Sequence, residues 1–178
     1  MPIRLVPILL VLLASAAPIQ AQEGAVRDAA LDRAIATFET ALPGLSGTEW
    51  GVDVAAYRDA LTLQQFRSAH WGGTVRLDFV IRAEASGPCG RFAAFTRIPP
   101  ENGAVQLVLC PQFFTRGADA LRELTVLHEV VHAVAGAGEC RAMAFAARVE
   151  QAARGQFTPV DAYWQANGCA TSAFSLPD

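Results

Sequence analysis

Residues 119–154 constrain the fold most, because they carry two helical patterns in succession with two glycines between them. In the first pattern, over 119–135, large apolar residues recur at helical spacing and form one stripe: Leu124, Leu127, Val131 and Val134. Gly136 and Gly138 stop this helix and permit the chain to reverse before the second helix, over 139–154. The sequence therefore predicts two joined helices, the first with its back on a core.

The remaining patterns predict a mixed α and β composition. A helix is expected over 24–42, and the stretch 45–73 is ambiguous, with a possible helix over 54–66. Strands are expected over 74–84, 91–97 and 104–110. Turn residues at 99–103 suit a hairpin-like connection, and a last helix opens at 158–160 and ends at 167–168. We expect an α+β fold with a small antiparallel or mixed sheet of about three strands, packed on the helices.

The N-terminus has the order of features of a secretory signal peptide. A basic residue, Arg4, precedes an apolar run that ends at Leu13, and small residues and a proline follow. We expect residues 1–21 to be removed, with cleavage after Ala16 or Ala17 as alternatives, and residues 22–178 to form one domain. An uncleaved anchor is the other interpretation. With cleavage the chain keeps no stable membrane span and is secreted or periplasmic.

Charge and cysteine content narrow the classes further. The net charge of −3 and the lack of a basic stripe argue against a nucleic-acid partner. Four cysteines behind a leader favour two disulfides over zinc ligation. We prefer Cys89–Cys110 and Cys140–Cys169, because each pair encloses one local structural unit.

The segment LHEVVHAVAGAGE carries the chemistry. On a helix His128 and His132 project from the same face, so their imidazoles can share one Zn²⁺. Glu129 is turned about 100° from His128 and suits a general base rather than a ligand. Glu139, beyond the glycines, is the predicted third ligand, with a first-turn glutamate favoured by the helix dipole as the plainer interpretation.

Other polar residues compete for roles at this site. Asp161 is the alternative third ligand, and its ordinary role would be a capping or exposed carboxylate. Glu150 is expected to be a solvated helix residue. Tyr163, Arg141 and His70 are candidates for stabilising an oxyanion, each also explained by a structural role.

Around these residues the sequence resembles a known family. The segments CGRFAAFTR, VQLVLCPQFF and LHEVVHAV, within residues 87–145, are similar to the aspzincins, the deuterolysin-type and lysine-specific metalloendopeptidases. The resemblance implies a zincin-like fold, a Cys89–Cys110 disulfide, His128 and His132 as zinc ligands and Glu129 as base. Glu139 falls on the position of the family's aspartate ligand and is similar to the glutamate of gluzincins.

The chain also departs from the family. Ala142 stands where the family has a tyrosine, and the gap between HExxH and the third ligand is much shorter. The strand over 104–110 is either the edge strand that binds extended peptide in such proteases or a buried core strand.

Three functions remain open from the sequence. The first is a secreted zinc metallopeptidase, an endopeptidase, acting on a peptide or protein substrate. The second is a catalytically degenerate zincin-like protein of the cell envelope that binds metal or a partner. The third is a disulfide-stapled interaction protein with an accidental HExxH.

Overall fold

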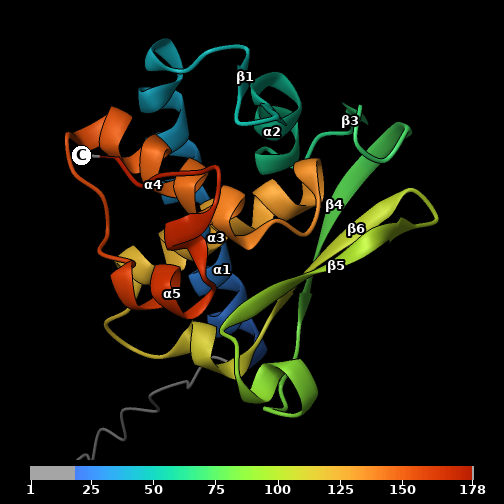
Figure 1. Cartoon of the computed structure of the whole chain (residues 1–178). Helices are drawn as coiled ribbons and strands as arrows, with labels where there is room; N and C mark the ends of the chain where they lie inside the picture. The colour runs from blue at the N-terminus through green and yellow to red at the C-terminus, as the bar shows by residue number, and fades with distance from the viewer. Residues whose placement is uncertain (1–18, 178) are drawn as a thin grey trace, which may run out of the picture.

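The long helix that carries HEVVH lies at the centre of the structure, a computed structural model that describes residues 19–177 (Figure 1). Residues 1–18, most of the predicted signal peptide, lie outside the described part. The helices are α1 (Ile19–Ala41), α2 (Val54–Leu61), α3 (Asp119–Ala135), α4 (Glu139–Arg154) and α5 (Asp161–Ala166). Short 3-10 turns are η1 (Leu42–Gly44), η2 (Gly87–Gly90), η3 (Pro111–Phe114) and η4 (Cys169–Thr171). Helix α3 packs against α1, α2, α4 and the main sheet.

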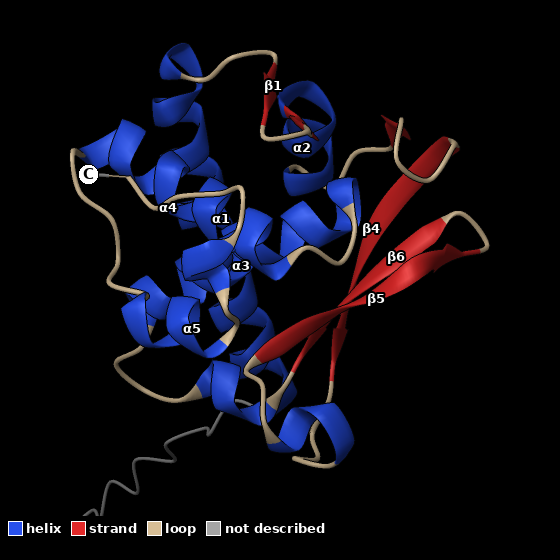
Figure 2. Cartoon of the chain, viewed as in Figure 1, coloured by secondary structure: helices blue, strands red, loops and turns tan. Residues whose placement is uncertain are grey.

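The main sheet is mixed and has four strands, one more than expected. Its strands are β3 (Phe66–Ser68), β4 (Gly73–Ile81), β5 (Ala94–Glu101) and β6 (Ala104–Leu109), in the order β3-β4-β6-β5. Strands β4 and β6 are parallel, and the two outer pairs are antiparallel. The helices lie on one side of this sheet, and β5 is its edge strand nearest α3 (Figure 2). The α+β class is thereby confirmed.

The predicted hairpin-like connection between the strands 91–97 and 104–110 is confirmed, but it is shorter than the expected 99–103. Strand β5 continues through both prolines to Glu101, and the turn is only Asn102-Gly103, both with positive φ, which suits a tight hairpin. Prolines are tolerated here because β5 is an edge strand with a register shift between Arg97 and Glu101. The predicted start of this strand, residue 91, is also three residues too early.

The ambiguous stretch 45–73 contains strands as well as a helix. A small two-stranded sheet, β1 (Thr48–Glu49) with β2 (Val52–Asp53), precedes α2. The Asp53 carboxylate accepts hydrogen bonds from the first-turn amides of α2, which fixes where that helix begins. Helix α2 ends at Leu61, and Leu63 has a φ of 58°, so Phe66 belongs to a strand and not to the helix.

Both preferred disulfides, Cys89–Cys110 and Cys140–Cys169, are present. The first covers the face of the sheet away from the helices, where Val108 is buried with it. The second ties the first turn of α4 to η4, one residue from Glu139. Within residues 19–177, no helix has both the length and the hydropathy of a membrane span.

The expectation of a solvated Glu150 is wrong, because this side chain is only 2% exposed. Its carboxylate accepts hydrogen bonds from the backbone and hydroxyl of Thr158 and pairs with Arg154, which also pairs with Glu123. A buried carboxylate needs such partners. They hold the segment before α5 against α4.

Candidate metal centre

Helix α3 presents His128 and His132 on the face predicted from their spacing. The apolar stripe of the helix is buried in the core, and each imidazole side chain is 7% exposed. The Nε2 atoms of the two rings lie 3.1 Å apart. The hydrophobic core does not need either ring. The two Nε2 atoms therefore can face a common point in the pocket.

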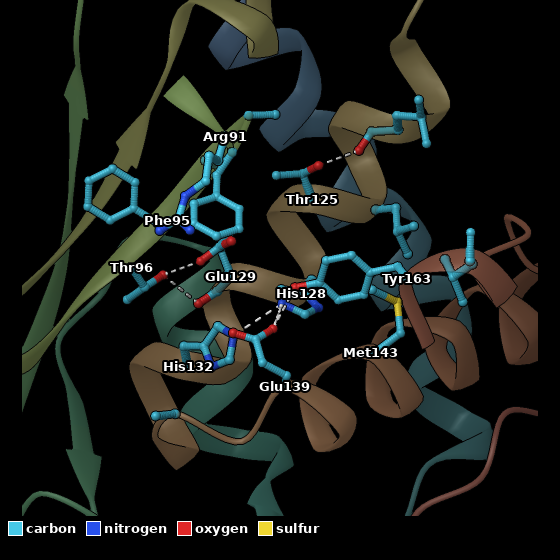
Figure 3. Close-up of a pocket in the computed structure, with 18 of the residues that line it drawn as sticks. Arg91, Phe95, Thr96, Thr125, His128, Glu129, His132, Glu139, Met143 and Tyr163 are labelled. Atoms are coloured by element: carbon cyan, nitrogen blue, oxygen red, sulfur yellow. Dashed lines mark hydrogen bonds and ion pairs between the residues drawn. The ribbon is translucent and has the colours of Figure 1, made fainter. Parts of the chain in front are cut away.

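Glu139 reaches that point from the first turn of α4. Gly136 makes the reversal possible, with φ 84° and ψ −168°, a conformation that residues other than glycine rarely adopt. The Glu139 Oε2 lies 3.2 Å from His128 Nε2, and Oε1 lies 3.6 Å from His132 Nε2. Figure 3 shows the carboxylate pointing at both rings. One donor atom from each of the three residues therefore lies within 4.8 Å of the others.

The hydrogen bond of His132 to the backbone leaves its Nε2 atom free to act as a ligand. Nδ1 lies 2.9 Å from the carbonyl oxygen of Gly136, so Nδ1 donates and Nε2 carries the lone pair. Among the described residues, the buried Nδ1 of His128 has no hydrogen-bond partner. Two imidazole nitrogens and a carboxylate that converge this closely are a donor set suited to a divalent ion.

The donor atoms lie close enough together for one metal ion. The two Nε2 atoms are 3.1 Å apart, and each has a different oxygen of Glu139 nearby, Oε2 at 3.2 Å from His128 and Oε1 at 3.6 Å from His132. Two imidazole nitrogens and a carboxylate form a donor set that a divalent ion such as Zn²⁺ accepts.

The charges of the site support each other. Burial alone would raise the pKa of Glu139, but hydrogen bonds from His128, His132 and Tyr163 hold it well below its ordinary value. Burial lowers and the Glu139 hydrogen bond raises the pKa of His132, with a net rise. Glu139 is thus ionised, as a metal ligand must be.

Asp161, the alternative third ligand, is not among the converging groups of the described residues. It lies exposed at the first residue of α5. From the same helix, Tyr163 donates a hydrogen bond of 2.7 Å to Glu139 Oε2. Burial first, and then this bond, raise the pKa of Tyr163, so the hydroxyl stays a donor.

The other two oxyanion candidates have different roles. Arg141 donates to the carbonyl of Ala135 and so caps the end of α3. His70 is exposed and lies against Gly136, outside the residues that line the site. Of the three candidates, only Tyr163 is at the site.

Glu129 lies on the other side of the histidines, toward the sheet (Figure 3). Its carboxylate accepts a 2.8 Å hydrogen bond from the hydroxyl of Thr96 in β5, and the same hydroxyl contacts its backbone carbonyl. Sequence reasoning missed Thr96, because an ordinary threonine in a strand carries no signal of a contact 33 residues away.

All four predicted site residues line one pocket of about 580 Å³. Strand β5 and the loop before it form one wall, and α3, α4, α5 and the segments before α4 and α5 form the rest. The strand over 104–110, in contrast, is β6, a central strand paired on both sides. The alternative of a buried core strand is therefore confirmed for β6, and the edge strand beside the site is β5.

No family model matches the chain, and no curated protein or solved structure shows significant similarity to it.

Proposed function

We propose that this protein is a zinc-dependent metallopeptidase, with His128, His132 and Glu139 as zinc ligands and Glu129 as general base. The observation that carries the proposal is the convergence of donor atoms from His128, His132 and Glu139, within 4.8 Å of one another, beside the separate carboxylate of Glu129 in one pocket. Three protein ligands leave a fourth position open, which is typical of catalytic rather than structural zinc sites. The resemblance to zincins, made from the sequence, points to the same chemistry.

A zinc ion held by His128, His132 and Glu139 would act as a Lewis acid on the scissile carbonyl and would lower the pKa of its bound water toward neutral pH. Glu129 accepts the proton of the attacking water and passes it to the leaving amine. The hydrogen bond from Thr96 holds the Glu129 carboxylate toward the pocket. Tyr163 orients Glu139 through its hydroxyl and stands beside His128, with ring centroids 5.9 Å apart.

Strand β5 is the proposed binding site for the peptide backbone of the substrate, since it is the sheet edge that borders the pocket. An extended peptide can add to such an edge through backbone hydrogen bonds. Two disulfides support a location in an oxidising compartment, as expected for an exported protein. We therefore propose that the enzyme acts outside the cytoplasm on peptides or proteins.

The test is zinc content and peptide hydrolysis measured together on the same preparations. Wild type should carry about one zinc per chain. Glu129→Gln should keep the zinc and lose about 10²- to 10⁴-fold in rate, because only the base is removed. Glu139→Ala should lose the zinc. Glu84→Gln, an exposed glutamate away from the pocket, is the matched control and should behave as wild type.

The outcomes separate the three functions. Stoichiometric zinc without hydrolysis of any peptide would favour the degenerate metal-binding protein. Absence of zinc from wild type would remove the zinc peptidase and leave a partner-binding protein, either the degenerate zincin-like protein or the interaction protein with an accidental HExxH. Hydrolysis in Glu129→Gln equal to wild type would remove the role given to Glu129.

A further inference from the structure

Beyond the three ligands, the pocket is walled chiefly by apolar side chains. Four of them are buried and come from β5, α3, α4 and the segment just before α5: Ala94, Leu124, Met143 and Val160. Two more are open to solvent, Phe92 at 41% and Leu121 at 56% exposure. An apolar cavity with a few polar groups at one side is the usual form of a small-molecule or side-chain site.

The exposed apolar side chains of this protein are concentrated at that pocket. Among residues 21–177, whose side-chain exposure is described, only Leu63, Phe92 and Leu121 are large, hydrophobic and exposed, and the last two line the pocket. Exposed apolar surface costs free energy in water, and its collection around one concavity indicates a surface that becomes covered by a ligand. Leu63 lies elsewhere and offers a control position.

The charged groups of the pocket exclude a basic ligand. Its lining carboxylates are Glu129 and Glu139, and both are engaged, the first by Thr96 and the second by the histidines and Tyr163. The remaining charge is that of Arg91, whose guanidinium lies 5.3 Å from the centre of the Phe92 ring. Among the described lining residues no carboxylate is left to pair with a lysine or arginine side chain, and Arg91 repels one.

We propose that this pocket receives a bulky apolar side chain, such as leucine or phenylalanine, of an extended peptide beside the scissile bond. The inference rests on the proposed peptidase function and names its substrate class. Burial of the side chain against Leu124, Met143 and Val160 favours binding, and Phe92 and Leu121 become covered on the solvent side. The lysine specificity known in part of the aspzincin family is therefore not expected here.

The first experiment compares zinc-loaded protein on peptides that differ at one residue beside the cleaved bond. Phenylalanine and leucine peptides should exceed the alanine peptide in kcat/KM by about tenfold or more, since one methylene alone is worth about that much in a fitted pocket. The lysine peptide should be the poorest. Hydrolysis without an apolar preference, or with a preference for lysine, would overturn the assignment of the pocket and leave the peptidase intact.

Two matched variants place the preference in this pocket. Leu121→Glu changes an exposed position, so the fold should survive, and the new carboxylate should lower the leucine-to-lysine ratio of kcat/KM at least about threefold. Leu63→Glu makes the same change outside the pocket and should keep the wild-type ratio. Equal ratios in the two variants would count against the proposal.

A binding measurement separates this inference from the catalytic one. Metal-free protein is titrated in NMR with the blocked tripeptides acetyl-Gly-Phe-Gly-amide and acetyl-Gly-Lys-Gly-amide. Only the phenylalanine peptide should shift the amide signals of Phe92 and Leu121. Such binding in a protein that hydrolyses no peptide would refute the peptidase and support the pocket. Equal shifts with both peptides, or shifts with neither, would refute the pocket.

Discussion

Replacement of Gly136 by alanine tests how Glu139, the proposed third ligand, is brought to the histidines. Gly136 turns the chain from α3 into α4, and its carbonyl accepts the hydrogen bond from Nδ1 of His132. Its φ of 84° and ψ of −168° lie in a region that is nearly restricted to glycine. An added Cβ would also lie 2.8 Å from Cε1 of His70.

The two effects have separate magnitudes. The backbone conformation costs about 1–3 kcal/mol with a Cβ present. Displacement of the His70 ring costs about 1 kcal/mol, the low end for an overpacked site, because that side chain is exposed and can move. The sum of about 2–4 kcal/mol is a large part of the 5–15 kcal/mol typical of a folded domain. If the carbonyl moves as well, zinc affinity should fall about 10- to 100-fold.

Urea unfolding of the metal-free protein, followed by circular dichroism, measures the first effect, and competition with a chelating dye measures the second. Gly138→Ser is the matched control, since Gly138 has an ordinary φ of −79° and its added Cβ would meet nothing closer than 3.5 Å. That variant should stay within about 0.5 kcal/mol of wild type. Adding His70→Ala to Gly136→Ala should restore only the part of the free energy of unfolding, about 1 kcal/mol, that is lost by displacing the His70 ring.

Gly136→Ala with a free energy of unfolding within about 0.5 kcal/mol of wild type would refute the argument from backbone conformation. A folded Gly136→Ala protein with unchanged zinc affinity would show that the Gly136 carbonyl does not orient His132.

Three further predictions concern the surroundings of the proposed metal site. Tyr163→Phe removes the hydroxyl that donates to Glu139 and should weaken zinc binding about tenfold, measured by dye competition. Equal affinity would contradict this prediction. Replacing both Cys140 and Cys169 by serine opens a link across 29 residues and should lower the free energy of unfolding in urea by about 3–4 kcal/mol, while a loss below about 1 kcal/mol would argue against a stabilising link. Thr96→Val removes the hydrogen bond to Glu129, the proposed general base, and should lower kcat/KM about tenfold at unchanged zinc content. A rate equal to wild type would show that this hydrogen bond does not matter for catalysis.

Much of the site could be predicted because its residues lie close together in the sequence. His128 and His132 are four residues apart, so any helix brings them to one face. Glu139 follows within one turn of the next helix, and the two glycines indicated a reversal between them. Only Gly136 needs the special conformation, while the φ of Gly138 is open to any residue.

The strand order could not be predicted, because it depends on which strands meet after the chain has crossed the sheet. The apolar pattern of 104–110 was equally consistent with an edge or a centre, and the prolines after 97 suggested a loop. In the structure the prolines belong to β5, which is an edge strand and so can omit their amide hydrogen bonds. The edge position of β5 is what places Thr96 beside Glu129.

Glu150 shows the same limit for charged residues. Nothing in its neighbourhood in the sequence marks it as buried, and a charged helix residue is ordinarily solvated. Its partners come from the end of α4 and from the segment after it, where Thr158 donates both its amide and its hydroxyl. A buried carboxylate can be recognised only when those donors are in place.

By itself the sequence determined the helical pair of histidines, the glutamate past the glycine reversal and the pairing of four cysteines, since each depends on a short stretch of chain or on a local unit. Only the tertiary structure removed Asp161 as the alternative to Glu139, and only it showed that Tyr163 and Thr96 hold the two glutamates. It also decided that apolar side chains from distant segments form one pocket beside them. The physical reason is that periodicity and turns act over a few residues, whereas convergence on a common centre depends on how packed helices and a sheet edge face one another.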